Sequence, residues 1–197
     1  MLQLILVRHG ETDSNKNRTY LGWTDVALND DGIRQAYEAK RKLVGIKVDA
    51  IYASPLKRAY HTAEIINEAF QLEIQLEDNL KERNFGVWDN LTLDEIKAKY
   101  QQEYDLYVQD WINYCVTDGE SSIQAYNRVT SFTDQLVKRN KEGTILLVTH
   151  LGCIRKIIAS MLGMTIEDSW RFKLDNGSIT RLEVNDEGYA YLSLLNG

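Results

Sequence analysis

Two apolar runs of the chain each end in a histidine that is followed closely by glycine. Residues 4–10 read LILVRHG, and residues 144–152 read TILLVTHLG. A continuous run of Leu, Ile and Val bounded by polar residues is typical of a strand buried on both faces, as in a parallel sheet. The carboxyl ends of such strands meet at one edge of the sheet, where open α/β sheets bind ligands. The two runs therefore predict that His9 and His150 face one crevice.

Segments of helical periodicity alternate with the apolar runs. A third apolar run covers 48–53, and the helical segments lie at about 30–44, 55–70, 121–140 and 152–162. This alternation predicts a three-layer α/β/α sandwich with a mostly parallel central sheet. Residues 178–195 alternate apolar and polar side chains around a turn at 185–188, so we expect a hairpin that adds an antiparallel edge.

The length of the chain fits one domain spanning residues 1–197, with a core that needs neither metals nor disulfides. Within it, residues 92–114 combine helical propensity with a high density of Tyr and Trp. Two interpretations are equally compatible with this periodicity: a helical flap over a pocket, or amphipathic helices packed on the sheet.

Composition excludes several classes of protein. The net charge of −6 argues against a general nucleic-acid binder, which needs clustered Lys and Arg. No apolar run approaches the roughly 20 residues that span a bilayer. Cys115 and Cys153 form no CxxC pattern, so we expect two free packing thiols, a cytoplasmic location and no zinc. No carboxylate cluster suggests another metal.

The stretch from Ser54 to Arg58, which reads SPLKR, follows the third apolar run and carries the pattern of a helix start. Ser54 is a candidate N-cap, and Pro55 suits the first helical position. Arg58 would then lie in the first turn, where the helix dipole disfavours a cation unless an anion is nearby. We therefore expect Arg58 and the free backbone N–H groups of this turn to face an anion.

The three strand ends bring Arg8, His9, Arg58 and His150 to one edge of the predicted sheet. Two arginines, two histidines and a helix N-terminus suit a dianionic phosphoryl group, which Arg binds with two hydrogen bonds at once. A single histidine after a strand is more often structural, but the joint occurrence favours a phosphate site. His61 follows no strand and no glycine turn, so we expect an ordinary surface or partly buried role for it.

These motifs carry a family resemblance. The chain resembles the histidine phosphatase superfamily, also called the phosphoglycerate mutase-like family, over nearly its whole length. The matching stretches are LVRHGET (6–12), GWTDVALNDDG (22–32), YASPLKRAYHTA (52–63), KERNFGVWDNLTLDEI (81–96), DGES (118–121) and LLVTHLGCIRKI (146–157).

The resemblance implies a phosphoglycerate mutase-like fold and assigns roles to individual residues. His9 would be the nucleophile that becomes a phosphohistidine, and Glu82 would donate a proton to the leaving oxygen. The remaining site residues would hold the phosphoryl oxygens or line the pocket: Arg8, Asn15, Arg58 and His150. The reaction would need no cofactor and no metal, because phosphoryl transfer depends mainly on positioning and on cationic stabilisation of the transferred group.

Three positions depart from the family pattern. Leu151 stands where many members have glycine, so we expect its side chain to line the substrate pocket. Asp89-Asn90 replaces the Glu-Gly that phosphatase-like members commonly carry after Trp. The segment around Trp111 lacks the Arg-Arg pair with which phosphoglycerate mutases bind their substrate. Trp23 is a candidate for a substrate-stacking wall, although the core is the slightly favoured place for Trp23 and Phe85.

The sequence leaves three functions open. The first is a phosphatase that hydrolyses a small phosphomonoester metabolite, such as an α-ribazole phosphatase or a broad-specificity phosphatase. The second is a 2,3-bisphosphoglycerate-dependent phosphoglycerate mutase. The third is a non-catalytic module that binds a phosphorylated ligand. The expected partner is a small phosphorylated metabolite, with neither nucleic acid nor membrane, and the chain is expected as a monomer or a homodimer.

Overall fold

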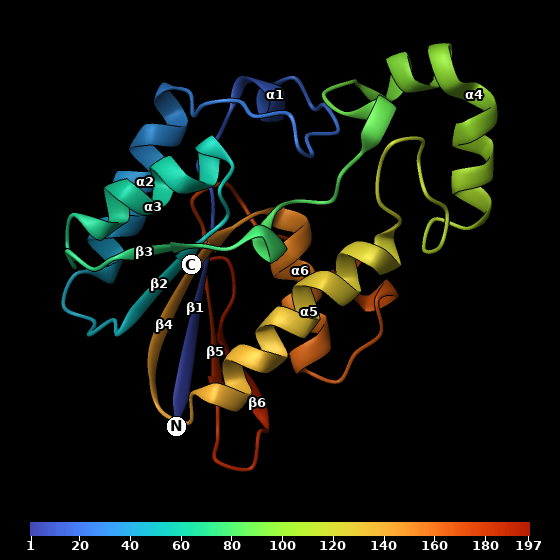
Figure 1. Ribbon diagram of the computed structural model, residues 1–197. Helices are drawn as coiled ribbons and strands as arrows, with labels where there is room; N and C mark the ends of the chain where they lie inside the picture. Colours follow the sequence, from blue (N-terminus) through green and yellow to red (C-terminus); the bar gives the residue numbers. More distant parts are fainter.

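A six-stranded sheet lies at the centre of the computed structural model, which describes residues 1–197 (Figure 1). The strands are β1 (Leu2–Arg8), β2 (Ala50–Ala53), β3 (Ile74–Leu76), β4 (Gly143–Thr149), β5 (Ile179–Val184) and β6 (Ala190–Leu194). Their order across the sheet is β3-β2-β4-β1-β5-β6. The first four strands of this order run parallel, and β5 and β6 add the antiparallel edge. The expected mostly parallel sheet with an antiparallel edge is confirmed.

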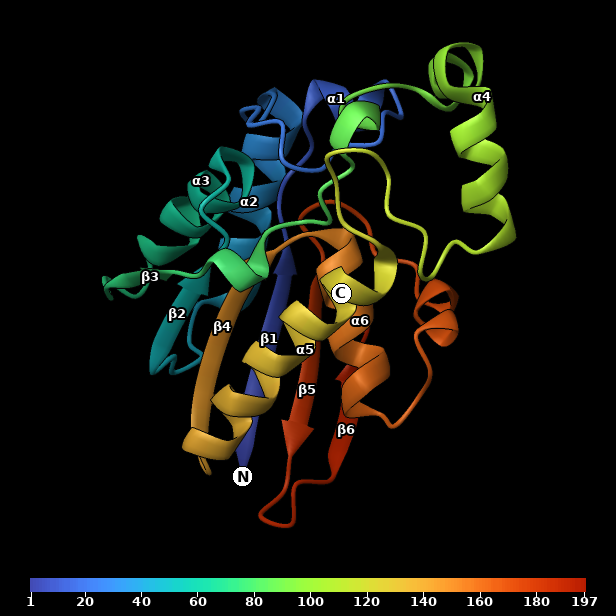
Figure 2. The same cartoon turned by 45° about the vertical axis from the view of Figure 1, so that its right-hand side comes forward.

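Helices cover both faces of the sheet, which gives the expected three layers (Figures 1 and 2). One face packs against α2 (Asp30–Leu43) and α3 (Lys57–Asn67), and the other packs against α5 (Ser122–Arg139) and α6 (Leu151–Met161). None of the helices combines the length and the apolar character that a membrane crossing requires.

Strand β1 contributes to both cores because successive side chains of a strand point to opposite faces. Leu4 and Leu6 belong to the core under α5 and α6, whereas Ile5 and Val7 belong to the core under α2 and α3. All four side chains are fully buried. The continuous apolar run before Arg8 is therefore the signature of a strand with a helical layer on each side.

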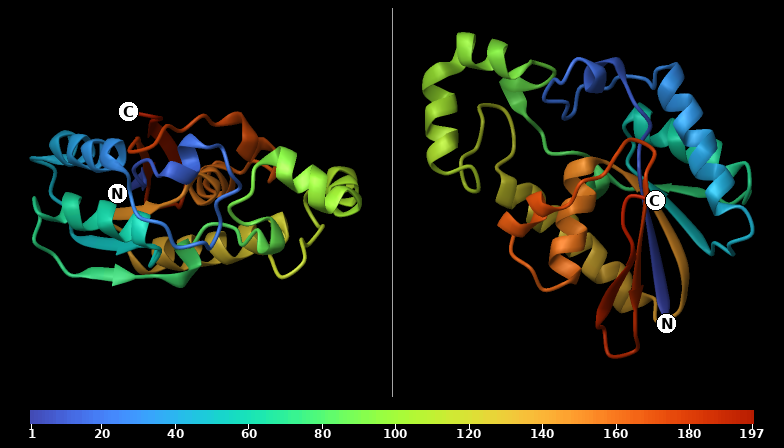
Figure 3. Two further views of the ribbon diagram at one scale, coloured as in Figure 1. Left: turned by 90° about the horizontal axis from the view of Figure 1, so that it is seen from above. Right: turned by 180° about the vertical axis from the view of Figure 1, so that it is seen from behind.

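The remaining elements lie at the carboxyl edge of the parallel strands and beyond it. They are α1 (Asp13–Lys16), α4 (Leu93–Gln109) and the 3-10 turns η1 (Asp78–Leu80), η2 (Gly86–Trp88) and η3 (Glu167–Arg171). Helix α4 is kinked at Tyr100 and stands apart from the sheet, at the far end of the molecule from α2 and α3 (Figure 3). It has a small core of its own around Trp88, Ile96 and Val116.

Two local expectations differ from the structure. Helix α3 begins at Lys57 with Leu56 as its N-cap, so Ser54 is not the N-cap and Pro55 precedes the helix. The side chain of Ser54 instead bonds to His150 and accepts the backbone N–H of Leu56, the residue before the helix. The three-residue strand β3 was not expected, because only one of its residues is even partly buried and no apolar pattern marks it.

Gly10 and Gly32 allow the segment after β1 to touch the first turn of α2 backbone to backbone. A Cβ on Gly10 would collide with the carbonyl of Gly32. We expect Gly10→Ala to lower the free energy of unfolding by about 3 kcal/mol, because two backbones must separate. Gly45→Ala is the matched control: Gly45 has a φ of 88° but open space around it, so only a backbone penalty of about 1–2 kcal/mol applies. Urea unfolding measures both, and equal losses in the two variants would contradict the collision.

Candidate active site

The parallel pairing of β1 with β4 brings His9 and His150 together at the carboxyl edge of the sheet. Arg8 lies opposite Thr149 in the register, and the backbone N–H of His9 donates to the Thr149 carbonyl at 2.9 Å. The two imidazole rings, one residue further on, have centroids 5.0 Å apart. Both rings are buried. Two residues separated by most of the chain therefore share one crevice.

The imidazole of His9 is neutral and presents one ring nitrogen. Burial lowers the pKa of His9 well below its usual value, and the nearby charges of Arg58 and Arg8 lower it further. Nδ1 lies 2.7 Å from the carbonyl oxygen of Gly10. A carbonyl only accepts, so Nδ1 carries the hydrogen and Nε2 keeps its lone pair. A neutral imidazole with a free Nε2 is the form that can attack phosphorus.

Ser54 holds the second imidazole from the opposite side of the crevice. The Nε2 atom of His150 lies 2.8 Å from Ser54 Oγ, which already accepts the backbone N–H of Leu56 at 3.4 Å. A hydroxyl that donates to His150 Nε2 leaves the hydrogen of His150 on Nδ1. Burial lowers the pKa of His150 well below its usual value, with smaller effects of Arg58, His9 and Arg8, so this ring is neutral too.

The two arginines are anchored by backbone carbonyls rather than by carboxylates. Arg8 donates to Leu174 at 2.7 Å, and Arg58 donates to Thr24 at 3.0 Å and to Gly22 at 2.6 Å. Burial lowers the pKa of Arg8 to about 10 and lowers that of Arg58 as well. Both groups remain cations at neutral pH, because a guanidinium group keeps its proton in proteins.

Three buried nitrogen atoms of the residues around His9 have no hydrogen-bond partner in the protein. They are Nε of Arg8, Nε of Arg58 and Nδ1 of His150. Buried donors are almost always paired in folded proteins, so unpaired ones call for an explanation. An anion with several oxygens would satisfy all three at once and would be stabilised by the two cations.

Asp89 fixes the loop that anchors Arg58. Its carboxylate accepts the backbone N–H groups of Gly22 at 2.8 Å, Trp23 at 2.5 Å and Thr24 at 3.0 Å. The carbonyls of Gly22 and Thr24 in turn accept from Arg58. The departure from the family pattern at this position thus supplies a bidentate acceptor for a loop of the site.

Glu82 lies beside this cage and is held at both ends of its carboxylate. Oε1 accepts the backbone N–H of Arg83 at 2.9 Å, and Oε2 accepts the backbone N–H of Gly152 at 2.9 Å. A Cβ at position 152 would collide with Oε1, so this contact requires glycine. Gly152 is the second residue of α6, for which His150 is the N-cap. The same helix start therefore positions a histidine of the cage and the carboxylate of Glu82.

Arg128 of α5 holds the backbone that leads to Glu82. It forms a bidentate ion pair with Glu120, with distances of 2.9 and 2.8 Å. It also donates to the carbonyls of Asn79 at 2.8 Å, Lys81 at 3.0 Å and Glu82 at 3.3 Å. The sequence reasoning missed this residue, although it lies eight positions after the Glu of the DGES motif, which is a little over two helical turns.

The predicted substrate-binding residues divide into those that line a pocket and those that do not. The pocket has a volume of about 480 Å³ and opens beside His9. Arg8, His9, Asn15, Glu82 and Leu151 line it. Arg58 and His150 are fully buried and are not among its lining residues.

Trp23 lies behind Glu82 and not in the pocket wall. Its indole N–H donates to the Glu82 carbonyl at 2.8 Å, and the ammonium of Lys81 lies 5.0 Å from its ring centroid. The side chain is 41% exposed, so the favoured core placement of Trp23 is wrong. A polar N–H on a large ring permits this arrangement, in which one edge bonds to the backbone and the rest faces solvent.

The remaining cations of the pocket wall and Trp170 were missed from the sequence, whereas Tyr107 and Trp111 lie in the segment 92–114, for which a flap over a pocket was one of the two interpretations. The aromatic residues of the wall are Tyr20, Phe85, Tyr107, Trp111 and Trp170, and its additional cations are Arg18, Arg83, Arg155 and Lys156. Arg155 and Lys156 follow Leu151 and Gly152 by four residues. This spacing places all four on one face of a helix, which was the available signal.

The two cysteines differ from each other. Cys153 is buried, its Sγ donates to the Lys81 carbonyl at 3.0 Å, and burial raises the pKa of its thiol to about 12. It is therefore a packing residue, as expected, and an unreactive thiol. Cys115 is exposed, so the expectation that it packs in the core is wrong. No group of three His, Cys, Asp or Glu side chains is arranged to hold a metal ion.

Comparison with known proteins agrees with this geometry. The model of the histidine phosphatase superfamily (branch 1) matches residues 4–196. Phosphoserine phosphatase 1 of Hydrogenobacter thermophilus is 34% identical over 194 residues, which cover 98% of this chain and 92% of that protein.

Two solved structures superpose over the whole chain. The crystal structure of a putative α-ribazole-5′-P phosphatase from Escherichia coli has a TM-score of 0.94 and 31% identity, covering 100% of this chain and 96% of that one. Phosphoserine phosphatase from Entamoeba histolytica, in complex with 3-phosphoglyceric acid, has a TM-score of 0.86 and 32% identity, with coverage of 100% and 98%. The chain belongs to the histidine phosphatase superfamily, branch 1.

Proposed function

We propose that the protein is a phosphatase that hydrolyses a small phosphomonoester through a phosphohistidine on His9, with Glu82 as the proton donor. The observation that carries this proposal is the state of His9. Its ring is neutral, its Nδ1 bonds to the Gly10 carbonyl, and its neighbours Arg8, Arg58 and His150 each have a buried nitrogen without a hydrogen-bond partner. A site built only to bind phosphate would not require a neutral imidazole with a free lone pair beside a carboxyl group.

The proposed reaction proceeds in two displacements. In the first, Nε2 of His9 forms a bond to phosphorus while the bond from phosphorus to the ester oxygen breaks, and Glu82 gives its proton to that oxygen. In the second, the Glu82 carboxylate accepts a proton from water, whose oxygen attacks phosphorus and releases His9. Arg8, Arg58 and His150 stabilise the charge on the transferred oxygens, so the step requires no metal ion or cofactor.

The segment 92–114 serves as a flap over the leaving group in this proposal. Tyr107 and Trp111 of this segment line the pocket, and Trp111 packs edge-on against Trp170 at 5.9 Å. Asn15, whose side-chain oxygen accepts from Thr12 and from Asn176, turns its amide toward the same space. The pocket volume suits a small metabolite rather than a protein substrate.

His9→Ala should abolish turnover while the fold remains. We expect a loss of about 10⁴-fold in kcat, because the variant lacks the atom that accepts the phosphoryl group. Release of free phosphate, measured with a chelator present, checks the rate and separates hydrolysis from transfer within 3-phosphoglycerate. Rapid quenching of the parent with labelled substrate should trap an acid-labile, alkali-stable phosphoenzyme. Activity within tenfold of the parent, or no label on His9, would rule out this nucleophile.

Glu82→Gln should matter most for substrates with poor leaving groups. The variant cannot donate a proton, so we expect kcat for an alkyl phosphate such as glycerol 3-phosphate to fall by about 10²- to 10⁴-fold. 4-Nitrophenyl phosphate releases a stable phenolate without protonation and should lose much less. Glu142→Gln, at an exposed acidic residue outside the pocket, is the control. Equal losses on the two substrates would show that Glu82 is not the acid.

Both site histidines should stay neutral at mildly acidic pH. Burial and the neighbouring cations lower the pKa of His9 and His150, so the folded protein binds fewer protons than the unfolded chain below about pH 6.5. The free energy of unfolding should therefore fall as the pH drops below that value. NMR of the substrate-free enzyme measures this. The ring C–H resonances of the two histidines, assigned by their loss in His9→Gln and His150→Gln, should not shift between about pH 8 and 6. A midpoint near 6.5 for either ring would refute the neutral-imidazole assignment.

A further inference from the structure

The active-site pocket is strongly positive although the protein as a whole is acidic. The chain has a net charge of −6, yet five cations line the pocket against two carboxylates, Glu11 and Glu82. The lining therefore has an excess of three positive charges. A bound phosphoryl dianion would neutralise two of them and would leave at least one. Arg58 does not line the pocket. It is left out of this count of charges because Asp89 and Asp25 lie near it. Arg18 is exposed, but the other four cations are at least partly removed from water and gain from compensation, so the pocket suits a strongly anionic ligand.

Four of the lining cations have no part in the phosphate cage and form no salt bridge within the chain: Arg18, Arg83, Arg155 and Lys156. Arg83 uses its donors inside the protein, on the Glu120 carbonyl at 2.8 Å, on Ser122 at 2.7 Å and on the Tyr114 carbonyl at 3.5 Å. The cations with donors left for a ligand are therefore Arg18, Arg155 and Lys156.

Lys156 lies on the leaving-group side of the site. It is one helical turn after Gly152, whose N–H holds the carboxylate of Glu82. Its ammonium makes a single hydrogen bond, a 3.3 Å contact to the Gly152 carbonyl, so two of its three donors are free. Burial lowers the pKa of Lys156, and the charge of Glu82 opposes that shift. An ammonium in this environment gains from an anionic ligand.

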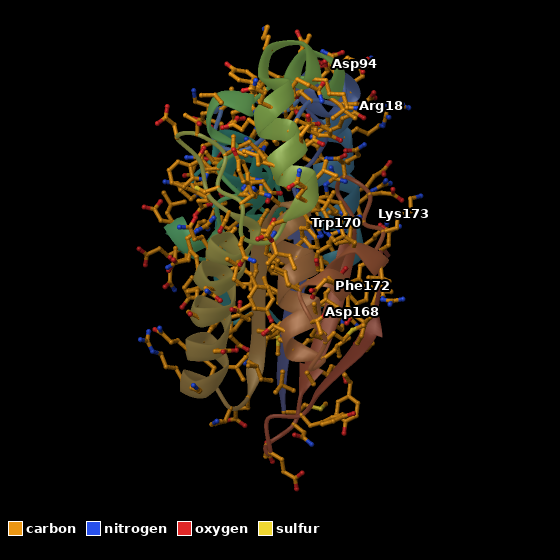
Figure 4. All side chains as sticks on the ribbon, turned by 90° about the vertical axis from the view of Figure 1, so that its right-hand side faces the viewer. Arg18, Asp94, Asp168, Trp170, Phe172 and Lys173 are labelled. Carbon is orange, nitrogen blue, oxygen red and sulfur yellow. The ribbon has the colours of Figure 1, made fainter.

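Arg155 and Arg18 extend the positive wall away from Lys156. The Nε of Arg155 donates to the Phe172 carbonyl at 2.7 Å, and its guanidinium lies over the Trp170 ring at 5.2 Å, which leaves both Nη groups without acceptors. Arg18 enters the pocket from the turn after α1. Figure 4 shows Arg18 and Trp170 on the same side of the molecule, with Arg18 above Trp170.

We propose that Lys156, supported by Arg155 and Arg18, forms a second anion subsite and that the substrate is a phosphorylated hydroxy acid. This inference rests on the proposed phosphatase function. Glu82 protonates the leaving oxygen, so the carbon chain attached to that oxygen lies next to Glu82 and hence next to Lys156. A carboxylate on that chain would meet the free ammonium donors and neutralise the remaining positive charge. A neutral leaving alcohol would leave this charge uncompensated.

Matched substrate pairs test the subsite. We expect the parent to prefer O-phosphoserine over O-phosphoethanolamine, and 3-phosphoglycerate over glycerol 3-phosphate, by about tenfold or more in kcat/KM, because each pair differs at the carboxylate. Fructose 1,6-bisphosphate against fructose 6-phosphate is the corresponding pair for a second phosphate. A larger preference in that pair than in the carboxylate pairs would overturn the assignment to a carboxylate.

Variants of Lys156 test whether this residue causes the preference for a carboxylated substrate. Lys156→Met should reduce the ratio of kcat/KM between the two members of a carboxylate pair by about tenfold, mainly through KM of the carboxylated substrate. Lys156→Arg keeps the charge and should retain most of the ratio, which separates loss of charge from loss of fold. Lys141→Met removes an exposed lysine with no salt bridge and should leave the ratio unchanged.

Two outcomes would overturn the subsite, and both differ from failure of the phosphatase proposal. The parent ratio could be below about threefold, or Lys156→Met could leave the ratio unchanged while the protein remains folded. In either case hydrolysis of 4-nitrophenyl phosphate and the phosphoenzyme on His9 would persist. If instead no phosphomonoester is hydrolysed and no phosphoenzyme forms, the proposed function itself fails.

Discussion

The parallel pairing of β1 and β4 is the constraint on which the site depends. Seven consecutive residue pairs align the two central strands, so the residues that follow them emerge side by side. A slip of one residue would displace one histidine by about 3.3 Å and turn its side chain to the other face. The register is protected because alternate residues of β1 are buried in two separate cores. The proposed nucleophile, His9, is thus positioned by the packing of strand residues that take no part in the reaction.

The proposed acid, Glu82, is positioned by different contacts, because it does not follow a central strand. Its carboxylate is held by the start of α6 through Gly152, and its backbone is held by Trp23 and Arg128. Helix α6 therefore links the two halves of the chemistry: His150 precedes it, Gly152 lies in its first turn, and Lys156 follows one turn later. A small rotation of this helix would disturb the cage, the acid and the pocket wall together.

Hydrophobic periodicity in the sequence predicted the strands and helices whose burial determines which positions are apolar. The runs that became β1 and β4, the four covering helices and the final hairpin were expected because burial on one or two faces leaves a period in the sequence. Strand β3 leaves no such period, and Ser54 was misassigned because a hydroxyl that caps a helix looks the same as one that bonds to a distant imidazole. Arg128 and Lys156 were missed since a cation on a helix is ordinarily a solvated one, and only tertiary contacts show otherwise.

The contact between Trp111 and Trp170 joins two segments that take no part in binding phosphate. One segment follows α4, which stands apart from the sheet, and the other belongs to η3. The reacting groups are anchored elsewhere, so the sequences of these two segments can change without lowering the rate of the reaction. Replacing the two tryptophan-bearing segments with those of a relative would change which alcohol is released. The residues that break the bond to phosphorus would stay unchanged. Different parts of the fold thus determine the reaction that the enzyme performs and the leaving groups that it accepts.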